Sequence, residues 1–246
     1  MSGVLPVTGI PAEGLPAYAL VTGDPERVPR IAERLEGARA VVKRREYVTY
    51  TGSWKGTNLV LSSHGIGAPG AALLFHELAQ GGVATIVRAG TCGALVESIS
   101  DGDLIVATRA VREDGVTDQM VPADYPASST PEVAMALQGA AERLGHPCHT
   151  GTVLTSALFF PGLLESTLST HARDGVIAVE MELAALFVVA ALKRIRAGGV
   201  LAVDGHPIGR TDPMAYQPGR DVVRDAVDAA VTVALDALAE LSGKAA

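Results

Sequence analysis

The stretch Val83-Ala84-Thr85-Ile86-Val87-Arg88-Ala89-Gly90-Thr91-Cys92-Gly93 decides the fold that this sequence predicts. Its first five residues are apolar or β-branched and predict a short buried strand. Arg88 stands directly after this strand and opens a small, glycine-rich turn. Ligands in open α/β sheets bind outside the carboxyl ends of strands. A fixed cation, backbone N–H groups and the Thr91 hydroxyl at that place suit an oxyanion such as phosphate. A surface arginine after a strand is the alternative.

The composition of the chain favours one compact domain over residues 1–246. Of its 246 residues, 48% are hydrophobic and 19% are charged, which is typical of a protein with a substantial core. The net charge is −7, and no basic cluster is longer than Lys43-Arg44-Arg45. We therefore expect no nucleic acid among the partners.

Membrane and export signals are not evident in the sequence. No apolar run reaches the length of a membrane span, and the first residues lack the pattern of a signal peptide. Cys92 and Cys148 have neither metal-ligand nor disulfide-framework spacing. We expect no membrane partner and a cytoplasmic location, where thiols stay reduced.

Strand-like and helix-like segments alternate along the chain. We expect strands over 18–22, 58–62, 83–87, 103–111, 150–155, 175–181 and 199–203, with another strand before the turn at 53–56. We expect helices over 25–35, 67–80, 131–144 and 182–194, and a long final helix through residues 223–241. The alternation predicts an α/β fold: a single domain whose mixed central sheet has helices on both faces.

The segment His64-Gly65-Ile66-Gly67-Ala68-Pro69-Gly70 contains the G-x-G-x-x-G pattern of dinucleotide-binding proteins. That reading requires an acidic residue at the end of the next strand to bind the ribose hydroxyls. Arg88 stands at that position instead. We therefore interpret the glycines as a tight turn between strand and helix, and a dehydrogenase is not predicted.

A second candidate anion-binding segment follows the first predicted strand. Gly23-Asp24-Pro25-Glu26-Arg27 places backbone N–H groups and an arginine at the start of a helix. Helix N-termini attract anions, so Arg27 is either a second phosphate ligand or a solvated helix residue.

Carboxylates end two other apolar strands. Glu180 and Glu182 follow one of them, and vicinal ribose hydroxyls would give a buried carboxylate the partner that it needs; a helix N-terminal acid is the alternative. Asp204 follows the apolar residues 199–203. Burial there would favour its protonated form, as a general acid near neutral pH requires, whereas an Asp-Gly turn is the alternative.

Taken together, these motifs resemble the hexameric nucleoside phosphorylase family, which includes purine nucleoside and uridine phosphorylases. The resemblance covers nearly the whole chain. It is carried by Gly23-Asp24-Pro25, Arg45-Glu46-Tyr47, His64-Gly65-Ile66-Gly67, Arg88-Ala89-Gly90-Thr91-Cys92-Gly93, Val179-Glu180-Met181-Glu182-Leu183-Ala184 and Val203-Asp204-Gly205. Val203-Asp204-Gly205 and Arg112-Glu113-Asp114 look most like a purine-using branch.

The resemblance implies phosphate-dependent cleavage of the N-glycosidic bond of a purine nucleoside, with inorganic phosphate as co-substrate and neither a metal nor an organic cofactor. It implies phosphate binding by Gly23, Arg27, Arg88, Gly90 and Thr91, and by Arg45 of a neighbouring subunit in a homohexamer. It implies ribose binding by Met181 and Glu182, base binding by Phe159, Cys92, Gly93 and Glu180, and proton donation to purine N7 by Asp204.

The sequence departs from the family pattern at three places. Val7 stands where family members usually bring a histidine from the neighbouring subunit to the ribose 5′-hydroxyl, so a 5′-modified or less polar sugar becomes conceivable. Ala157 stands where an acid is often found. The stretch 159–162 is followed by Leu163, Leu164 and Glu165, which lack the amide and guanidinium groups with which uridine phosphorylases bind uracil.

Three other functions compete with this interpretation. Uridine phosphorylase is the first. A catalytically weak nucleoside-binding relative is the second, motivated by Val7 and the altered base loop. The third is a hydrolase with Cys92 as nucleophile and His64 as base, which leaves the arginine-bearing segments unexplained.

Overall fold

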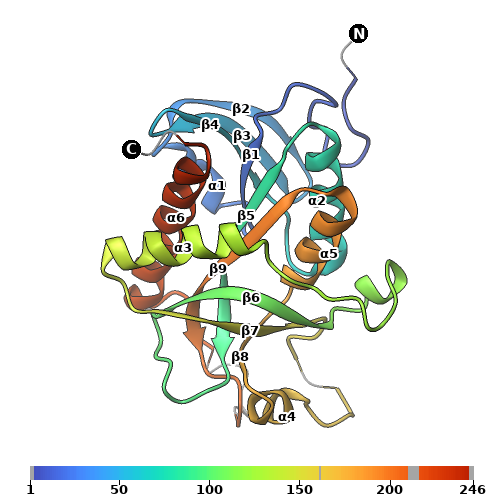
Figure 1. Cartoon of the computed structure of the whole chain (residues 1–246), viewed down its shortest axis with the longest axis vertical. Coiled ribbons are helices and arrows are strands. Elements are labelled where there is room, and N and C mark those ends of the chain that lie inside the picture. The colour runs from blue at the N-terminus through green and yellow to red at the C-terminus, as the bar shows by residue number, and fades with distance from the viewer. Residues whose placement is uncertain (1–2, 161, 210–215, 244–246) are drawn as a thin grey trace.

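In the part of the chain that the structure describes, nine strands form one sheet, and helices cover both of its faces (Figure 1). The structure, a computed structural model, describes residues 3–160, 162–209 and 216–243. The strands are β1 (Tyr18–Thr22), β2 (Glu36–Arg44), β3 (Tyr47–Trp54), β4 (Thr57–Ser63), β5 (Thr85–Ala94), β6 (Leu104–Glu113), β7 (Cys148–Ser156), β8 (Val176–Glu180) and β9 (Arg196–Gly205). The helices are α1 (Arg27–Ala32), α2 (Ala68–Gln80), α3 (Pro131–Leu144), α4 (Leu168–Arg173), α5 (Leu183–Lys193) and α6 (Asp221–Leu241), with a 3₁₀ turn η1 (Thr117–Gln119).

The sheet is mixed, as the sequence predicts. Strand β1 lies parallel to β4 and β5, whereas β3 is antiparallel to both β2 and β4. The β3–β4 hairpin turns through Lys55 and Gly56, whose φ angles are both positive (48° and 75°). Positive φ at both central residues is the type I′ geometry that suits the twist of a hairpin.

Five of the strands close into a ring that the sequence does not reveal. Strand β5 pairs with β8, β8 with β7, β7 with β6, β6 with β9, and β9 again with β5. Closure removes free sheet edges. Such long-range pairing leaves little trace in local sequence, because the residues of one strand do not specify which distant strand pairs with it.

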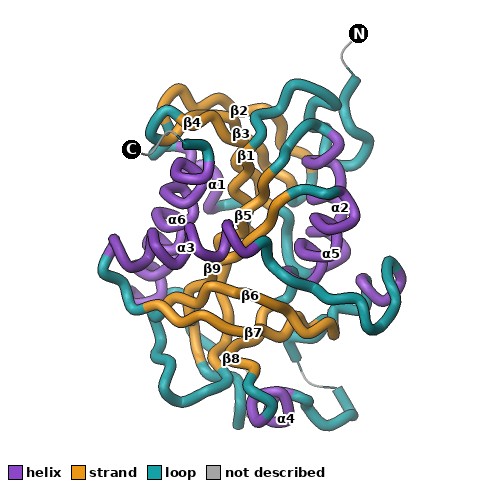
Figure 2. The backbone as a smooth tube through the Cα atoms, in the orientation of Figure 1, coloured by secondary structure: helices purple, strands orange, loops and turns teal. Residues whose placement is uncertain are grey.

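Two helical layers bury the faces of the sheet (Figure 2). Helices α2 and α5 cover one face with a core that includes Phe75 and Phe187. Helices α1, α3 and α6 cover the other, where Leu137 and Leu238 are fully buried. Each such side chain contributes about 1.5–3 kcal/mol of transfer free energy. The predicted mixed sheet with helices on both faces is confirmed.

The predicted turn after Val87 is wrong, because β5 continues through it to Ala94. Strand β9 pairs with β5 from Thr85 to Gly93 and so extends the ladder across the glycines. Arg88 consequently lies inside a strand rather than after it.

Other predicted boundaries change less. Helix α1 covers only 27–32 of the expected 25–35. The sequence prediction also missed β2, η1 and α4, which are a largely exposed strand and two short helical segments. Within the described ranges, no helix is both long and apolar enough to cross a membrane.

Glu77 of α2 fixes the N-terminal loop. Its carboxylate accepts hydrogen bonds from the backbone N–H groups of Val7 (2.9 Å) and Thr8 (2.8 Å) and from the Thr8 hydroxyl (2.6 Å). Thr8 and Glu77 are both buried. Val7, at one of the three places where the sequence departs from the family pattern, is therefore held on α2 through its backbone.

Replacing Glu77 with Ala leaves three donors without their acceptor. We expect Glu77→Ala to lower the free energy of unfolding by about 3 kcal/mol, because each buried unsatisfied donor is costly. Urea denaturation measures this change. Gln80→Ala, at an exposed position of the same helix, should change it by less than about 0.5 kcal/mol. Equal midpoints for the two variants would contradict the assignment.

Candidate active site

The candidate site lies where β1 ends beside β5. Val21 is the last β1 residue paired with β5, opposite Arg88, and β8 pairs with β5 only from Gly93 onwards. Among the described residues, 89–92 therefore have no strand neighbour on that side. This open stretch of strand edge separates the end of β1 from the end of β8.

Arg88 is a buried cation at this edge, with 4% of its surface exposed. Its guanidinium forms an ion pair with Glu182, and its Nη2 lies 3.7 Å from Oε2 of Glu180. Burial alone disfavours the charge, but the two carboxylates outweigh it and raise the pKa of Arg88 above its usual value. Nε and Nη1 find no hydrogen-bond partner among the described residues. These buried donors are suited to an oxyanion.

Glu182 links this cation to the start of α2. Its Oε1 accepts a 2.6 Å hydrogen bond from the backbone N–H of Gly67, while Oε2 contacts Arg88. Burial opposes its charge, but Arg88, with smaller help from His64 and Gly67, holds the pKa of Glu182 below its usual value. Glu182 is therefore ionised.

Glu180 fixes the start of α5. Its carboxylate accepts hydrogen bonds from the Thr155 hydroxyl (2.5 Å) and from the backbone N–H groups of Glu182 (2.8 Å) and Leu183 (2.9 Å). Burial, followed by the charge of Glu182, raises the pKa of Glu180 to about 7 despite the opposing Arg88. Through these contacts Glu180 holds the start of α5 in place beside Arg88. Its predicted contact with a base stays a prediction.

Two glycines allow the cluster to pack closely. A Cβ on Gly90 would overlap Nη1 of Arg88, so the guanidinium lies over a residue that must lack a side chain. Likewise, a Cβ on Gly199 of β9 would overlap the side chain of Leu183, which seats the N-terminus of α5 directly on the sheet. Glycine is needed at both positions because a neighbouring side chain lies too close for a Cβ, and not because the backbone needs flexibility.

His64 adds a neutral ring beside the ion pair. Its Nδ1 lies 2.8 Å from the carbonyl oxygen of Gly65, so Nδ1 carries the proton and Nε2 offers a lone pair. Burial, and then the Arg88 charge, lower the pKa of His64 to about 4. Gly23 lies next to this ring, since a Cβ there would come within 3.7 Å of it.

Arg27 and Arg45 are outside this cluster. The Nε of Arg27 lies 3.5 Å from the carboxylate of Asp24. Its helix α1 has only six residues, and the predicted role of Arg27 in phosphate binding stays a prediction. Arg45 is exposed at the β2–β3 turn. Its predicted role in a neighbouring subunit stays a prediction.

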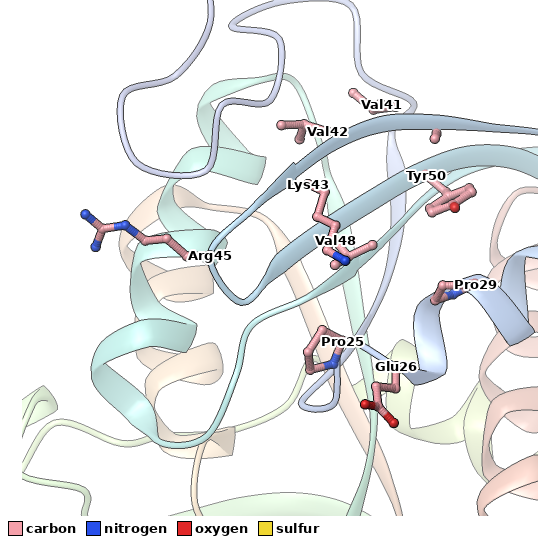
Figure 3. A pocket seen from close by; sticks show the side chains of 10 residues that line it. Pro25, Glu26, Pro29, Val41, Val42, Lys43, Arg45, Val48 and Tyr50 are labelled. Carbon is pink, nitrogen blue, oxygen red and sulfur yellow. The ribbon is translucent and has the colours of Figure 1, made fainter.

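A groove between α1 and the β2–β3 hairpin has a volume of about 740 Å³ (Figure 3). Valine and proline make up half of its lining residues. Arg45 is the one predicted site residue in the lining, and it points away from the other labelled side chains. The residues of the Arg88 cluster, which are Arg88, Glu180 and Glu182, are not among those that line this groove.

Asp204 ends β9 and is 6% exposed. Its Oδ2 accepts a 2.7 Å hydrogen bond from the phenol of Tyr216, whose ring packs edge-on against Phe159 with the centroids 5.2 Å apart. The sequence interpretation missed Tyr216. The scarcity of aromatic residues, 4% of the chain, was the available signal.

Cys92 lies near Arg88 and Glu180 as well as near Asp204, because the charges of all three act on its thiol. Burial, followed by the charges of Asp204 and Glu180, raises its pKa well above the usual value for a thiol. The thiol is therefore neutral and a poor nucleophile, which argues against the hydrolase alternative. A Cβ on the neighbouring Gly93 would lie 2.8 Å from Pro207, so the chain is closely packed here.

Thr91 and Met181 are both partly exposed next to these groups. Thr91 follows Gly90 on the open edge of β5, and Met181 stands between the two glutamates. The structure thus brings Gly23, Arg88, Gly90, Thr91, Cys92, Gly93, Glu180, Met181 and Glu182 to one region. Asp204 is close enough to Cys92, a residue of this region, for its charge to raise the pKa of the Cys92 thiol.

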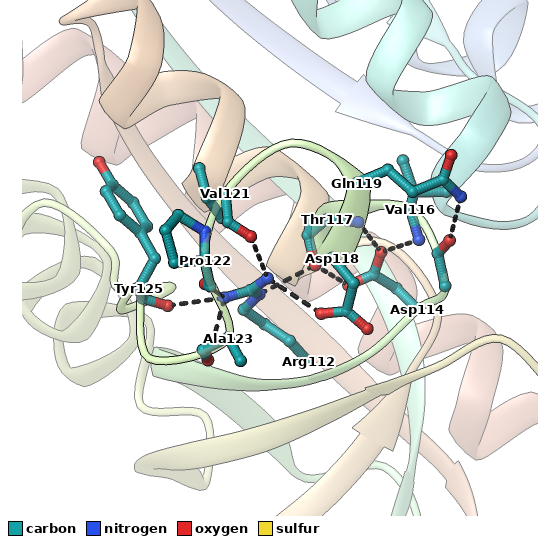
Figure 4. A network of polar contacts seen from close by, with 11 residues as sticks. Arg112, Asp114, Val116, Thr117, Asp118, Gln119, Val121, Pro122, Ala123 and Tyr125 are labelled. Atoms are coloured by element: carbon teal, nitrogen blue, oxygen red, sulfur yellow. Dashed lines mark hydrogen bonds and ion pairs between the residues drawn. The ribbon is translucent and has the colours of Figure 1, made fainter.

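Arg112 and Asp114 stabilise the loop after β6 (Figure 4). The Arg112 guanidinium donates to the carbonyl oxygens of Pro122 (2.8 Å) and Tyr125 (3.0 Å). Asp114 accepts from the backbone N–H and the hydroxyl of Thr117 (2.7 and 2.5 Å). The motif that looked purine-specific in the sequence thus includes two residues that fix a loop.

The part of the chain that the structure describes contains no group of three or more His, Cys, Asp or Glu residues placed to hold a metal ion.

The sequence profile of the Phosphorylase superfamily matches residues 17–241. The chain belongs to this family. It is 34% identical to a guanosine phosphorylase of Halorubrum lacusprofundi (91% of this chain and 93% of the relative) and 33% identical to a purine nucleoside phosphorylase of Plasmodium falciparum (99% of each). A uridine phosphorylase of Thermococcus kodakarensis is 39% identical over 76% of this chain and 72% of its own length.

Solved structures agree with this assignment. A purine nucleoside phosphorylase from Toxoplasma gondii, in complex with immucillin-H, superposes with a TM-score of 0.92 at 30% identity and covers 98% of this chain and 97% of its own. A uridine phosphorylase from Vibrio fischeri gives a TM-score of 0.88 at 25% identity, covering 97% and 98%. The fold is therefore shared by purine and uridine enzymes.

Gly90→Ala tests the packing of the Arg88 cluster. The added methyl group displaces the guanidinium from Glu182 and leaves buried carboxylates unpaired, so we expect the free energy of unfolding to fall by about 3–5 kcal/mol. Gly139→Ala in α3 is the matched control, because its Cβ would meet only the Arg143 side chain, at 3.2 Å. Urea denaturation compares the two, and an unchanged Gly90→Ala stability would refute the close approach.

Proposed function

We propose that this protein cleaves the N-glycosidic bond of purine nucleosides of the inosine and guanosine type with inorganic phosphate, releasing the free base and ribose 1-phosphate. The observation that carries the proposal is the buried Arg88 guanidinium. It contacts Glu182 and keeps Nε and Nη1 without a partner among the described residues. Such an arrangement supplies an anion site directly beside a carboxylate that can accept from sugar hydroxyls.

Phosphate would bind at Arg88, with Gly23, Gly90 and Thr91 around it. As the bond between C1′ and N9 breaks, its electrons pass to the base and the sugar gains oxocarbenium character. The phosphate anion stabilises that charge and then forms a bond from oxygen to C1′. The protein contributes position and electrostatics.

The sugar would be held by Glu182 and Met181. Both Glu182 oxygens already accept one hydrogen bond or ion pair, and each carboxylate oxygen has a further lone pair. Ribose hydroxyls can therefore bind to the same carboxylate that pairs with Arg88. Val7, if brought by a neighbouring subunit as the family pattern implies, would give the 5′ end of the sugar an apolar neighbour.

The base would pack on Phe159, and Asp204 would give a proton to N7 as the base departs. Asp204 is buried at the end of β9 and accepts from Tyr216. The guanosine and purine nucleoside phosphorylases among the relatives support a purine. The Thermococcus uridine phosphorylase, at 39% identity, makes uridine the second candidate.

A nucleoside panel with and without phosphate tests this proposal. We expect release of hypoxanthine from inosine and of guanine from guanosine only when phosphate is supplied, because the anion is the nucleophile. Chromatography of base and ribose 1-phosphate measures both products. Equal release without phosphate would point to a hydrolase, uridine cleavage alone to the second candidate, and binding without turnover to a nucleoside-binding relative.

Asp204→Asn tests the general acid. Loss of the proton donor should lower kcat for inosine by roughly 10²–10⁴-fold. Asp124→Asn, at an exposed loop position, makes the same chemical change away from the site and should keep the wild-type rate. Steady-state kinetics on inosine decides, and a near-normal Asp204→Asn enzyme would remove Asp204 from this role.

A further inference from the structure

Tyr216 contacts two residues with different proposed roles. Its phenol donates a 2.7 Å hydrogen bond to Oδ2 of Asp204, and its ring packs against Phe159 with the centroids 5.2 Å apart. Asp204 is 6% exposed and Tyr216 is partly exposed, so the carboxylate end of the bond is shielded from bulk water. A hydrogen bond to a carboxylate is stronger in such surroundings than in water.

Arg220 fixes the segment that carries Tyr216. Its Nη2 donates to the backbone carbonyl oxygen of Asp204 (3.0 Å), and its Nε donates to that of Gln217 (3.1 Å). Its Nη1 forms a 2.6 Å ion pair with Asp101. One guanidinium thus ties the residue after Tyr216 to the end of β9. The phenol is held beside Asp204 by this clamp as well as by its own hydrogen bond.

We infer that Tyr216 is a positioning residue for Asp204. The inference rests on the proposed function, in which Asp204 is the acid. When the Asp204 O–H bond breaks and the N7–H bond forms, a carboxylate remains at Asp204. The phenol O–H of Tyr216 stabilises this carboxylate and fixes its orientation, while the Tyr216 ring supports Phe159. Tyr216 therefore acts on the departure of the base and not on the binding of phosphate.

Tyr216→Phe removes the hydroxyl and keeps the ring. We expect kcat for inosine to fall about 10- to 100-fold, the effect of one hydrogen bond to a charged group. KM for phosphate and for inosine should stay within about twofold, because Arg88 and Glu182 are untouched. Tyr18→Phe is the matched control: it removes a phenol that donates to the carbonyl of Leu241, remote from Asp204.

A second substrate separates a role in proton transfer from a structural one. The base of 7-methylinosine is already cationic and needs no proton at N7. We expect its kcat in Tyr216→Phe to stay within about twofold of the wild-type value. Equal losses on inosine and 7-methylinosine would overturn the inference, as would unchanged rates on both.

A double-mutant cycle with Asp204→Asn provides an independent test. If Tyr216 acts through Asp204, Tyr216→Phe should have no further effect on inosine cleavage once the acid is gone. Additive losses would reject the coupling. A wild-type protein that does not cleave inosine would reject the proposed function together with this inference. An active wild type with an unimpaired Tyr216→Phe variant would reject only the role of Tyr216.

Discussion

The buried charge of Arg88 is the constraint on which the site depends. Removing a guanidinium from water costs several kcal/mol unless well-placed partners compensate it. Glu182 supplies the direct partner, and Glu180 supplies a second carboxylate while holding the first turn of α5. Gly90 leaves the space that the guanidinium occupies. The same residues that stabilise this region of the fold are therefore also the ones that form the proposed anion site.

The charges of the cluster nearly balance near neutral pH. Burial, and then Glu182, raise the pKa of Glu180 to about 7, and burial lowers that of His64 to about 4. At neutral pH His64 is uncharged and a large share of Glu180 is protonated, so Arg88 and Glu182 remain as opposite charges. Because its pKa in the fold lies above the ordinary value, Glu180 favours the fold at low pH, and this contribution is lost as the pH rises towards 7.

From the sequence, the fold class and the strand ends that carry the charged residues could be predicted. The side chains that those charged residues contact could not. Glu180 at the end of a strand and Asp204 at the end of another could be predicted because apolar runs mark buried strands. The course of β5 through Gly90 could not, because a glycine-rich stretch also fits a turn, and only pairing with β9 decides. The contact of Tyr216 with Asp204 depends on tertiary structure, which no local pattern records. The predicted role of Arg45 involves a neighbouring subunit, which no pattern within one chain specifies.

The Arg88–Glu182 ion pair explains how one small cluster could orient two substrates. Under the proposed function, phosphate binds to the cation and ribose to the anion of the same pair. Their separation is then fixed by a contact that exists within the folded chain, and not by two independently mobile side chains. Pre-set geometry of this kind lowers the entropic cost of bringing nucleophile and sugar together. Glu182 is held in place because its carboxylate accepts from the Gly67 N–H and its own backbone N–H donates to Glu180. Under the proposed function, the sheet and the first residues of α2 and α5 therefore determine the relative position of phosphate and sugar.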